Sequence, residues 1–239
     1  MKIVISQPML FPWVGMLEQV RAADVFVHYP DVQFSKGSFV NRVQVKTAAG
    51  PRWLTVPLDD LHLGQLINEV RVNNRKDWRS AHLSLLADAF AGCPFADDAL
   101  SVARSAYEGD HVDIASLSEA SLMAVCGYYG LDKGRSFLRS SDLGISGSGS
   151  QRVLDIVRSL GGDTYITGHG ARHYLDHEAF ERAGIAVRYM DYRANRYPQR
   201  HGDFTPYVTS LDLIANTGGA GLARIEPVTI DWKEFTRNG

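Results

Sequence analysis

The sequence predicts an α/β fold with a mostly parallel, Rossmann-like sheet and a helical insertion near residues 74–130. Three observations predict it. Residues 3–29 have the pattern of a strand, a short helix and a second strand. Residues 77–129 have helical periodicity, and helix and strand patterns alternate again over residues 153–190. Because a chain of 239 residues can bury a sizeable core, we expect a single α/β domain over residues 1–239.

The first pattern opens with a continuous apolar run at residues 3–5, which suits a strand covered on both faces. Pro12 fits the first turn of a helix, where its missing N–H is not needed. Apolar side chains then recur at i, i+3, i+4 and i+7 on one helical face: Trp13, Met16, Leu17 and Val20. A second strand is expected at residues 25–29. Two strands joined by one short helix are expected to pair in parallel.

The remaining elements follow from the same kinds of pattern. Two strands are expected on either side of a turn at residues 48–51, and residues 67–72 are a further strand candidate. The Gly- and Ser-rich stretch 140–150 is interpreted as a mobile loop rather than a domain boundary. The other expected elements are helices at 77–90, 114–129 and 153–160, strands at 164–167 and 185–190, and a turn leading into a helix at 168–176.

Composition excludes several function classes. The chain is 45% hydrophobic and 22% charged with a formal charge of −2, so no overall basic field supports nucleic-acid binding. Cys93 and Cys126 lack metal-type spacing and are expected to be buried thiols of a reducing compartment. The first residues lack a signal-peptide pattern, and no apolar run approaches the length of a membrane span. We expect a cytoplasmic protein without membrane contact that acts on a small molecule.

Five stretches occur in order along nearly the whole chain: SQPMLFPWVGMLEQVRAADVFVHYPDVQFSKGSFVNRVQV, WRSAHLSLLADAFAGCPF, SSDLG, GGDTYITGHGARHYLD and YPQRHGDFTPYVTSLDLIANTG. Together they resemble the WbqC-like protein family, bacterial proteins encoded among genes for O-antigen and other surface or secondary-metabolite glycans. The resemblance implies a setting in nucleotide-sugar and polysaccharide biosynthesis, with roles such as amino-acid transfer to an amino sugar. The family usually has Pro or Ala where His169 stands, so His169 is not carried over from it.

The first segment is also similar, more loosely, to the start of nucleotidylyltransferase-type Rossmann folds such as pantothenate synthetase. Those enzymes usually carry a His-x-x-His or His-x-Gly-His signature after the first strand, where it binds phosphates. This chain has Phe-Pro-Trp-Val-Gly at residues 11–15 and no histidine there. The similarity therefore implies a fold and not the chemistry of those enzymes.

Gln7 is the first candidate for ligand binding. It stands at the carboxyl end of the first strand, where open α/β sheets bind ligands, and its amide is suited to a base, a ribose or an amino-sugar amide. The alternative is that Gln7 ties down a turn. Trp13 is a second binding candidate. Gly15 lets either a ligand or a neighbouring element approach the helix closely.

A polar cluster follows the second strand. Lys36, on a loop, and Arg42, on the next strand, are candidates for clamping a phosphate or diphosphate, a task that suits the planar fork of arginine. Gln33 and Asn41 are further binding candidates. The sequence Lys-Gly-Ser at residues 36–38 lacks the rest of a Walker signature. The alternative is a solvated loop with ordinary surface charges.

Three histidines, His169, His173 and His177, have the i, i+4, i+8 spacing of a zinc-binding helical face. The flanking glycines place His169 in a loop, and no Glu or Cys completes a zinc signature, so no metal is predicted. The segment is better interpreted as a strand-to-helix turn that faces an anion, with a ligand-free tight turn as the alternative. Its binding candidates are Thr167, Gly168, Gly170 and Arg172.

The stretch NRYPQRHGDF contains the last candidates. Tyr197 is suited to stacking on a sugar or base and Gln199 to hydrogen bonding it. His201 and Asp203 are a candidate acid–base pair, and His169 is a further catalytic candidate. No arrangement typical of nucleophilic catalysis is present in the sequence.

The family resemblance and these polar segments predict a transferase of bacterial glycan or related secondary metabolism. It would join an acyl or amino-acid group to an amino-bearing acceptor such as an amino sugar, with ATP as a candidate cofactor for activation through a nucleotide. The substrate candidates are an amino sugar, a nucleotide sugar and an amino acid. The alternative is a non-catalytic nucleotide-sugar-binding partner of another pathway enzyme. The sequence leaves the donor, the acceptor and the oligomeric state open.

Overall fold

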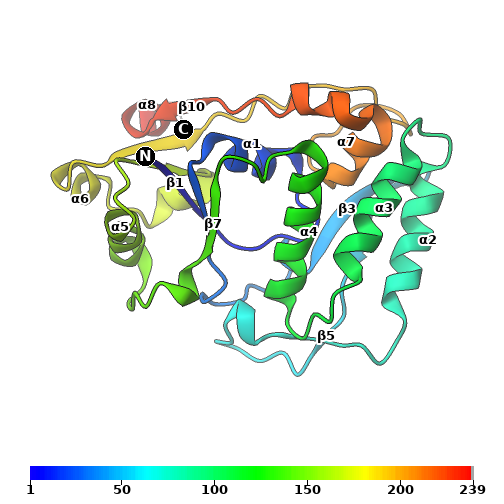
Figure 1. The fold of residues 1–239 in the computed structure, drawn as a ribbon, viewed down its shortest axis with the longest axis horizontal. Helices are drawn as coiled ribbons and strands as arrows, with labels where there is room; N and C mark the ends of the chain where they lie inside the picture. The colour runs from blue at the N-terminus through cyan, green and yellow to red at the C-terminus, as the bar shows by residue number, and fades with distance from the viewer. Residues whose placement is uncertain (238–239) are drawn as a thin grey trace.

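Six strands form the central sheet of this protein, whose computed structural model describes residues 1–237. Five strands are parallel, and the sixth pairs antiparallel at one edge. Their order across the sheet is β10-β9-β8-β1-β2-β7 (Figure 1). We number the five parallel strands by their order in the chain and read them across the sheet from β7 to β9. Their order is then 3-2-1-4-5, which is the Rossmann order. The strands are β1 (Lys2–Ser6), β2 (Val25–His28), β7 (Ser136–Arg139), β8 (Thr164–Thr167), β9 (Ala186–Met190) and β10 (Thr229–Asp231).

Helices cover both faces of this sheet. Successive side chains of a strand point to opposite faces, so the continuous apolar run of β1 places apolar side chains on both faces, and each face is buried by packing against helices. From β1, Val4 packs into one hydrophobic core together with Leu17 of α1 (Val14–Ala22). Ile3 and Ile5 point to the other face, where Val153 of α5 (Gly149–Ser159) packs in a second core. The short helix α6 (His177–Arg182) adds Phe180 to that second core. The predicted α/β architecture is thus confirmed.

The predicted helical insertion is present between β6 and β7 and holds three helices. Figure 1 shows them side by side at the end of the molecule opposite α5 and α6. Asp77 and Asp113 begin two of them, because their side chains accept hydrogen bonds from the N–H groups of Ser80 and Ser116. An antiparallel hairpin and a later helix pack with them in the same core. These elements are α2 (Trp78–Phe90), α3 (Ala96–Tyr107), α4 (Ile114–Tyr129), α7 (Ser210–Thr217), β3 (Arg42–Thr47) and β4 (Gly50–Thr55).

The prediction of a strand at residues 67–72 is wrong for the first half of that segment. The chain makes a 3₁₀ turn there, because the Glu69 carboxylate accepts the Leu66 N–H at 2.9 Å and Gln65 donates to the Glu69 carbonyl at 3.0 Å. Of residues 67–72, only Arg71–Val72 form a strand. The small elements are β5 (Leu58–Asp59), β6 (Arg71–Val72), η1 (Ile67–Glu69), η2 (Ser140–Asp142), η3 (His169–His173), η4 (Gly218–Arg224) and α8 (Trp232–Arg237).

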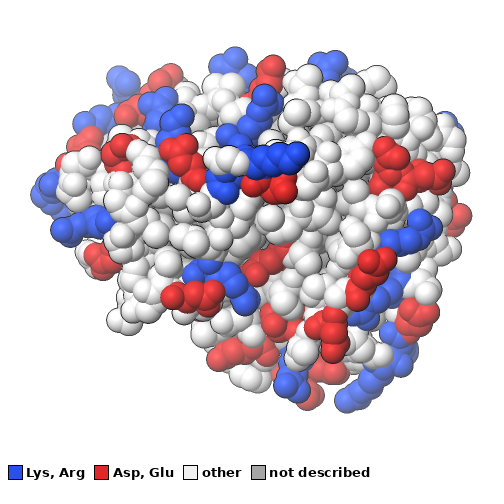
Figure 2. Space-filling view, viewed as in Figure 1, with Lys and Arg blue, Asp and Glu red and all other residues white. Residues whose placement is uncertain are grey.

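The surface carries both signs of charge. Figure 2 shows Lys and Arg interspersed with Asp and Glu on the face drawn, with wide uncharged areas between them. Cys93 and Cys126 are free and buried, as the sequence predicts. Within residues 1–237, none of the helices combines the length and the apolar character that crossing a membrane requires.

Candidate functional site

A crevice of about 730 Å³ opens where the chain direction across the sheet reverses. From β1 the chain moves to β2 on one side, whereas β8 lies on the other side of β1. The loops that leave the carboxyl ends of β1 and β8 therefore diverge, and open α/β sheets bind ligands between such loops. Gln7, directly after β1, and Gly168, directly after β8, both line the crevice.

Aromatic rings form much of the crevice wall. The Trp13 ring lies 4.8 Å from the ring of Tyr192 and 5.5 Å from that of Tyr207, measured between ring centres. Tyr29 and Tyr174 line it from the loops after β2 and β8. Tyr174 and Tyr207 are 50% and 61% exposed, so their ring surfaces are available to a ligand.

The polar groups among the lining residues are mainly neutral: Ser6, Gln7, Gln19 and Thr167 line the crevice, whereas no lysine or arginine within residues 1–237 does. Gln19 is buried, and its Nε2 donates a 2.8 Å hydrogen bond to the Tyr192 hydroxyl, which fixes that ring. Gly149, the first residue of α5, also lines the crevice. The positive end of the α5 dipole is therefore at its edge.

His169 is the histidine in the crevice. Its Nε2 lies 2.8 Å from the carbonyl oxygen of Met190. Because a carbonyl oxygen only accepts, we assign a proton to Nε2, and in this tautomer Nδ1 is the acceptor nitrogen. The Tyr192 and Phe235 rings flank the imidazole at 5.1 and 4.9 Å. A residue of the crevice wall thus has a ring nitrogen that can accept a proton.

Two glycines let the crevice walls approach closely. A Cβ on Gly15 would lie 2.2 to 2.6 Å from three atoms of the Trp13 ring, so the ring folds over the start of α1 only because residue 15 has no side chain. A Cβ on Gly168 would lie 3.1 Å from the Tyr192 hydroxyl. Gly170 lines the crevice but has open space around it.

The structure places Lys36, Arg42, Asn41 and Gln33 outside the residues that line the crevice. The Arg42 guanidinium lies 4.2 Å above the Trp53 ring and donates to the Gly37 carbonyl. Asn41 is buried and donates to the Val56 carbonyl at 3.0 Å. Lys36 is exposed on a loop that lies beside the loop after β1, because the Phe39 carbonyl accepts a hydrogen bond from the Leu10 N–H. Gln33 is also exposed and forms an isolated β-bridge with Leu66.

The candidates of the 196–203 loop surround a lysine that sequence reasoning missed. Buried Lys46 donates to Gln199 Oε1 at 3.1 Å and to two backbone carbonyls of the loop, one of them that of Asp203. Gln199 also donates to the Tyr197 hydroxyl. His201 lies 2.8 Å from the Ala89 carbonyl, 112 residues away in sequence. The loop candidates thus hold the loop in place and do not line the crevice.

The three histidines do not share a helical face. His169 and His173 are in the 3₁₀ turn η3, whereas His177 begins α6 after a break and stacks on Trp232 at 4.6 Å. Arg172 points to a separate depression beside Phe235, 5.9 Å from that ring. Within residues 1–237, no three His, Cys, Asp or Glu side chains are grouped as a metal site would require.

Sequence reasoning also missed Glu18. The helical pattern places residues 18 and 19 off the apolar face, which predicts exposure. Glu18 is nevertheless 3% exposed, because other segments cover that side of α1. Arg21, one turn later, donates to the Leu222 and Ile225 carbonyls, which shows that one of these segments lies against the helix. Only that distant packing, and no local pattern, reveals the buried carboxyl.

Comparisons with known proteins agree with the resemblance seen in the sequence. A sequence model of the WbqC-like protein family matches residues 7–223. A Mycobacterium tuberculosis protein described as "uncharacterized protein Rv1507c" is 31% identical over 220 residues, which cover 91% of this chain and 94% of that protein. No solved structure matches the chain.

Proposed function

The chain belongs to the WbqC-like protein family, and on this premise we propose that it is a transferase that joins an acyl or amino-acid group to an amino-bearing sugar. Family membership fits a role in glycan-associated biosynthesis at a coarse level. The finer proposal is carried by one observation, the crevice at the switch point of the sheet, with its aromatic walls and neutral amide and hydroxyl groups.

These lining groups suit a sugar. The faces of a sugar ring present C–H groups that pack on aromatic rings, while its hydroxyl groups need donors and acceptors such as the Gln7 amide and the Thr167 hydroxyl. The volume of about 730 Å³ lies within the range of roughly 300–1,000 Å³ typical of small-molecule sites. A phosphate of an activated donor would lie at the start of α5, near Gly149, where a helix N-terminus favours anions.

The proposed chemistry is attack of the sugar amine on the carbonyl carbon of an activated acyl group. A C–N bond forms, the bond to the leaving group breaks, and the amine loses a proton. His169 Nδ1 is the proposed acceptor of that proton, because the Met190 carbonyl holds Nε2–H and so fixes the tautomer. The backbone N–H groups of the Gly168–Gly170 turn are the proposed donors to the oxygen that gains negative charge.

Calorimetric titration with D-glucosamine, N-acetylglucosamine and a uridine-diphosphate sugar tests the sugar site. Trp13→Ala is expected to weaken binding of the best ligand about tenfold, since stacking on one ring is worth about 0.5–1.5 kcal/mol and the neighbouring rings also lose support. The matched control is Trp53→Ala, which removes an exposed ring outside the crevice. Equal affinity of wild type and Trp13→Ala would refute the proposed site.

A non-catalytic sugar-binding role is the second candidate, favoured by the absence of a Cys or a Glu/Asp among the lining residues of the described chain. Mass spectrometry separates the two. Wild-type protein given amino sugar, an amino acid and ATP is expected to form an amide product, and His169→Ala is expected to bind the sugar without forming it. Sugar binding with no product from wild type, across a panel of activated donors, supports the binding role.

A further inference from the structure

A second, smaller cavity adjoins the crevice and contains a buried acid. Glu18 is 3% exposed, and its Oε2 has no hydrogen-bond partner among residues 1–237. The charged groups that act on it are two further carboxylates, those of Glu226 and Asp191. Burial, with these two like charges, raises the pKa of Glu18 to about 7. A buried carboxylate is normally paired with a positive group. Within residues 1–237, no Lys, Arg or His side chain lines this cavity.

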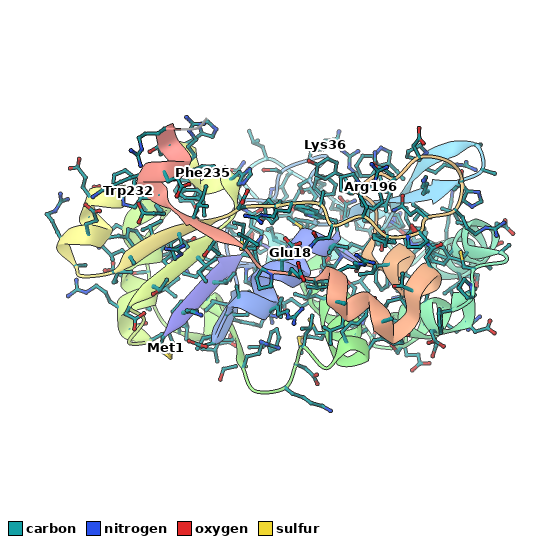
Figure 3. All side chains as sticks on the ribbon, turned by 90° about the horizontal axis from the view of Figure 1, so that it is seen from above. Met1, Glu18, Lys36, Arg196, Trp232 and Phe235 are labelled. Atoms are coloured by element: carbon teal, nitrogen blue, oxygen red, sulfur yellow. The ribbon has the colours of Figure 1, made fainter. Side chains whose placement is uncertain are left out.

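Aromatic rings enclose the space next to this carboxyl. Trp13 and Tyr192 line both this space and the crevice, and Tyr197 and Phe204, which pack edge to face at 5.3 Å, also line it. The amide of Asn195 also lines it. Figure 3 shows Glu18 on α1 in the middle of the molecule. The void is about 10 Å³ for the centre of a water-sized sphere, which admits one water-sized group.

We propose that this inner cavity, formed by Glu18 and its aromatic walls, binds the primary ammonium group of an aminoacyl donor. A primary ammonium matches the cavity in charge, because Glu18 offers an unpaired oxygen, and in surroundings, because aromatic faces attract cations. It also matches in size, since an ammonium group is about as large as a water molecule. The cavity has no space for a large side chain on that nitrogen.

This inference rests on the proposed function and makes it more specific. The crevice alone admits either a plain acyl group or an aminoacyl group as donor. Because Trp13 and Tyr192 line both spaces, a donor whose carbonyl lies in the crevice would direct its α-ammonium toward Glu18. The inner cavity therefore selects aminoacyl donors over acyl groups that lack the amine.

Glycinamide and acetamide are suitable probes, because they differ by the ammonium group and neither carries a carboxylate. Glycinamide is expected to bind the wild-type protein and to raise its Tm, whereas acetamide is not. Glu18→Gln keeps the shape of the side chain and is expected to weaken glycinamide binding roughly tenfold to a hundredfold, the range for a charge-assisted hydrogen bond. Methylammonium chloride is expected to act like glycinamide, and sodium chloride at the same concentration is not.

Glu226→Gln is the matched control, because it removes an exposed neighbouring carboxylate that contributes only through its charge. It is expected to bind glycinamide within about twofold of wild type, since exposed charges are strongly screened. Equal binding of glycinamide by wild type and Glu18→Gln would overturn the inference, as would equal effects of acetamide or of sodium.

The sugar titrations distinguish failure of this inference from failure of the proposed function. Sugar binding that depends on Trp13, without Glu18-dependent glycinamide binding, removes the ammonium site and leaves the sugar site. Glycinamide binding that depends on Glu18, without any sugar binding, retains the ammonium site and refutes the sugar acceptor.

Discussion

Replacing Gly15 by alanine is expected to disturb the crevice, although the same change usually stabilises a helix. Gly15 is the second residue of α1, and alanine in a helix is favoured over glycine by up to about 1 kcal/mol. Here the new Cβ would lie 2.2, 2.5 and 2.6 Å from atoms of the Trp13 ring. Such distances are far inside van der Waals contact, so the ring has to leave its position.

The size of the effect follows from what the ring then loses. Trp13 packs on Tyr192 at 4.8 Å and on Tyr207 at 5.5 Å, and an aromatic pair is worth about 0.5–1.5 kcal/mol. Losing both contacts costs about 1–3 kcal/mol. After a gain in helix propensity of up to about 1 kcal/mol, the variant is expected to be about 0–3 kcal/mol less stable than wild type. Its affinity for the sugar is expected to fall as in Trp13→Ala.

Urea unfolding measures this stability difference, and calorimetric titration with the sugar measures the affinity. The matched control is Gly127→Ala in α4, where a new Cβ has no neighbour within 4 Å. That variant is expected to gain up to about 1 kcal/mol and to bind the sugar normally. If Gly15→Ala gains as much stability as Gly127→Ala and binds the sugar equally well, the reasoning about the Trp13 ring is wrong.

Three further predictions concern buried or catalytic groups. Because Glu18 has a folded pKa of about 7 against an ordinary 4.5, its stabilising contribution is present below pH 4.5 and is lost as the pH rises through 7. Urea unfolding should show that, between pH 4.5 and 7, the wild type loses at most about 3 kcal/mol of its free energy of unfolding relative to Glu18→Gln. A difference between the two proteins that does not change with pH would contradict this prediction. Lys46→Met leaves several loop acceptors unpaired and is expected to cost about 2–4 kcal/mol while folded protein still binds sugar, measured by urea unfolding and titration. His201→Ala is expected to retain amide formation, whereas His169→Ala is expected to abolish it in a mass-spectrometric assay; equal loss in both variants would assign no special role to His169.

Local patterns in the sequence were sufficient to predict part of the fold. The N-terminal βαβ unit was predicted because its apolar residues repeat with a period that depends on nothing outside it. Its parallel pairing placed Gln7 at the edge where ligands bind, and the structure has Gln7 in the crevice. By contrast, β7 was not predicted. It is a four-residue edge strand without a fully buried residue, so it lacks both alternation and a continuous apolar run.

The candidate site was predicted less completely because its burial depends on contacts between distant segments. Glu18 looks like a solvent-facing residue of an amphipathic helix until the segments after β9 and α7 cover it. Lys46 gains its partners from a loop about 150 residues later, as the separation of 153 residues from Gln199 shows. His201 helps to hold the same loop through a different long-range contact, with the Ala89 carbonyl, which the spacing of His201 and Asp203 cannot reveal.

The pairing of β1 with β8 has a consequence for how this protein reaches its native state. Lys2 pairs with Thr164, so the chain has to be synthesised beyond residue 164, and two segments far apart in sequence have to meet, before the crevice has two sides. Contacts of such long sequence separation slow folding, because the entropy of closing the loop is lost before the contact forms. We therefore expect the ability to bind a ligand to arise late in refolding, after helices such as α4 have formed. No separate fragment of the chain contains the whole crevice, because its walls extend from Ile5 to Tyr207.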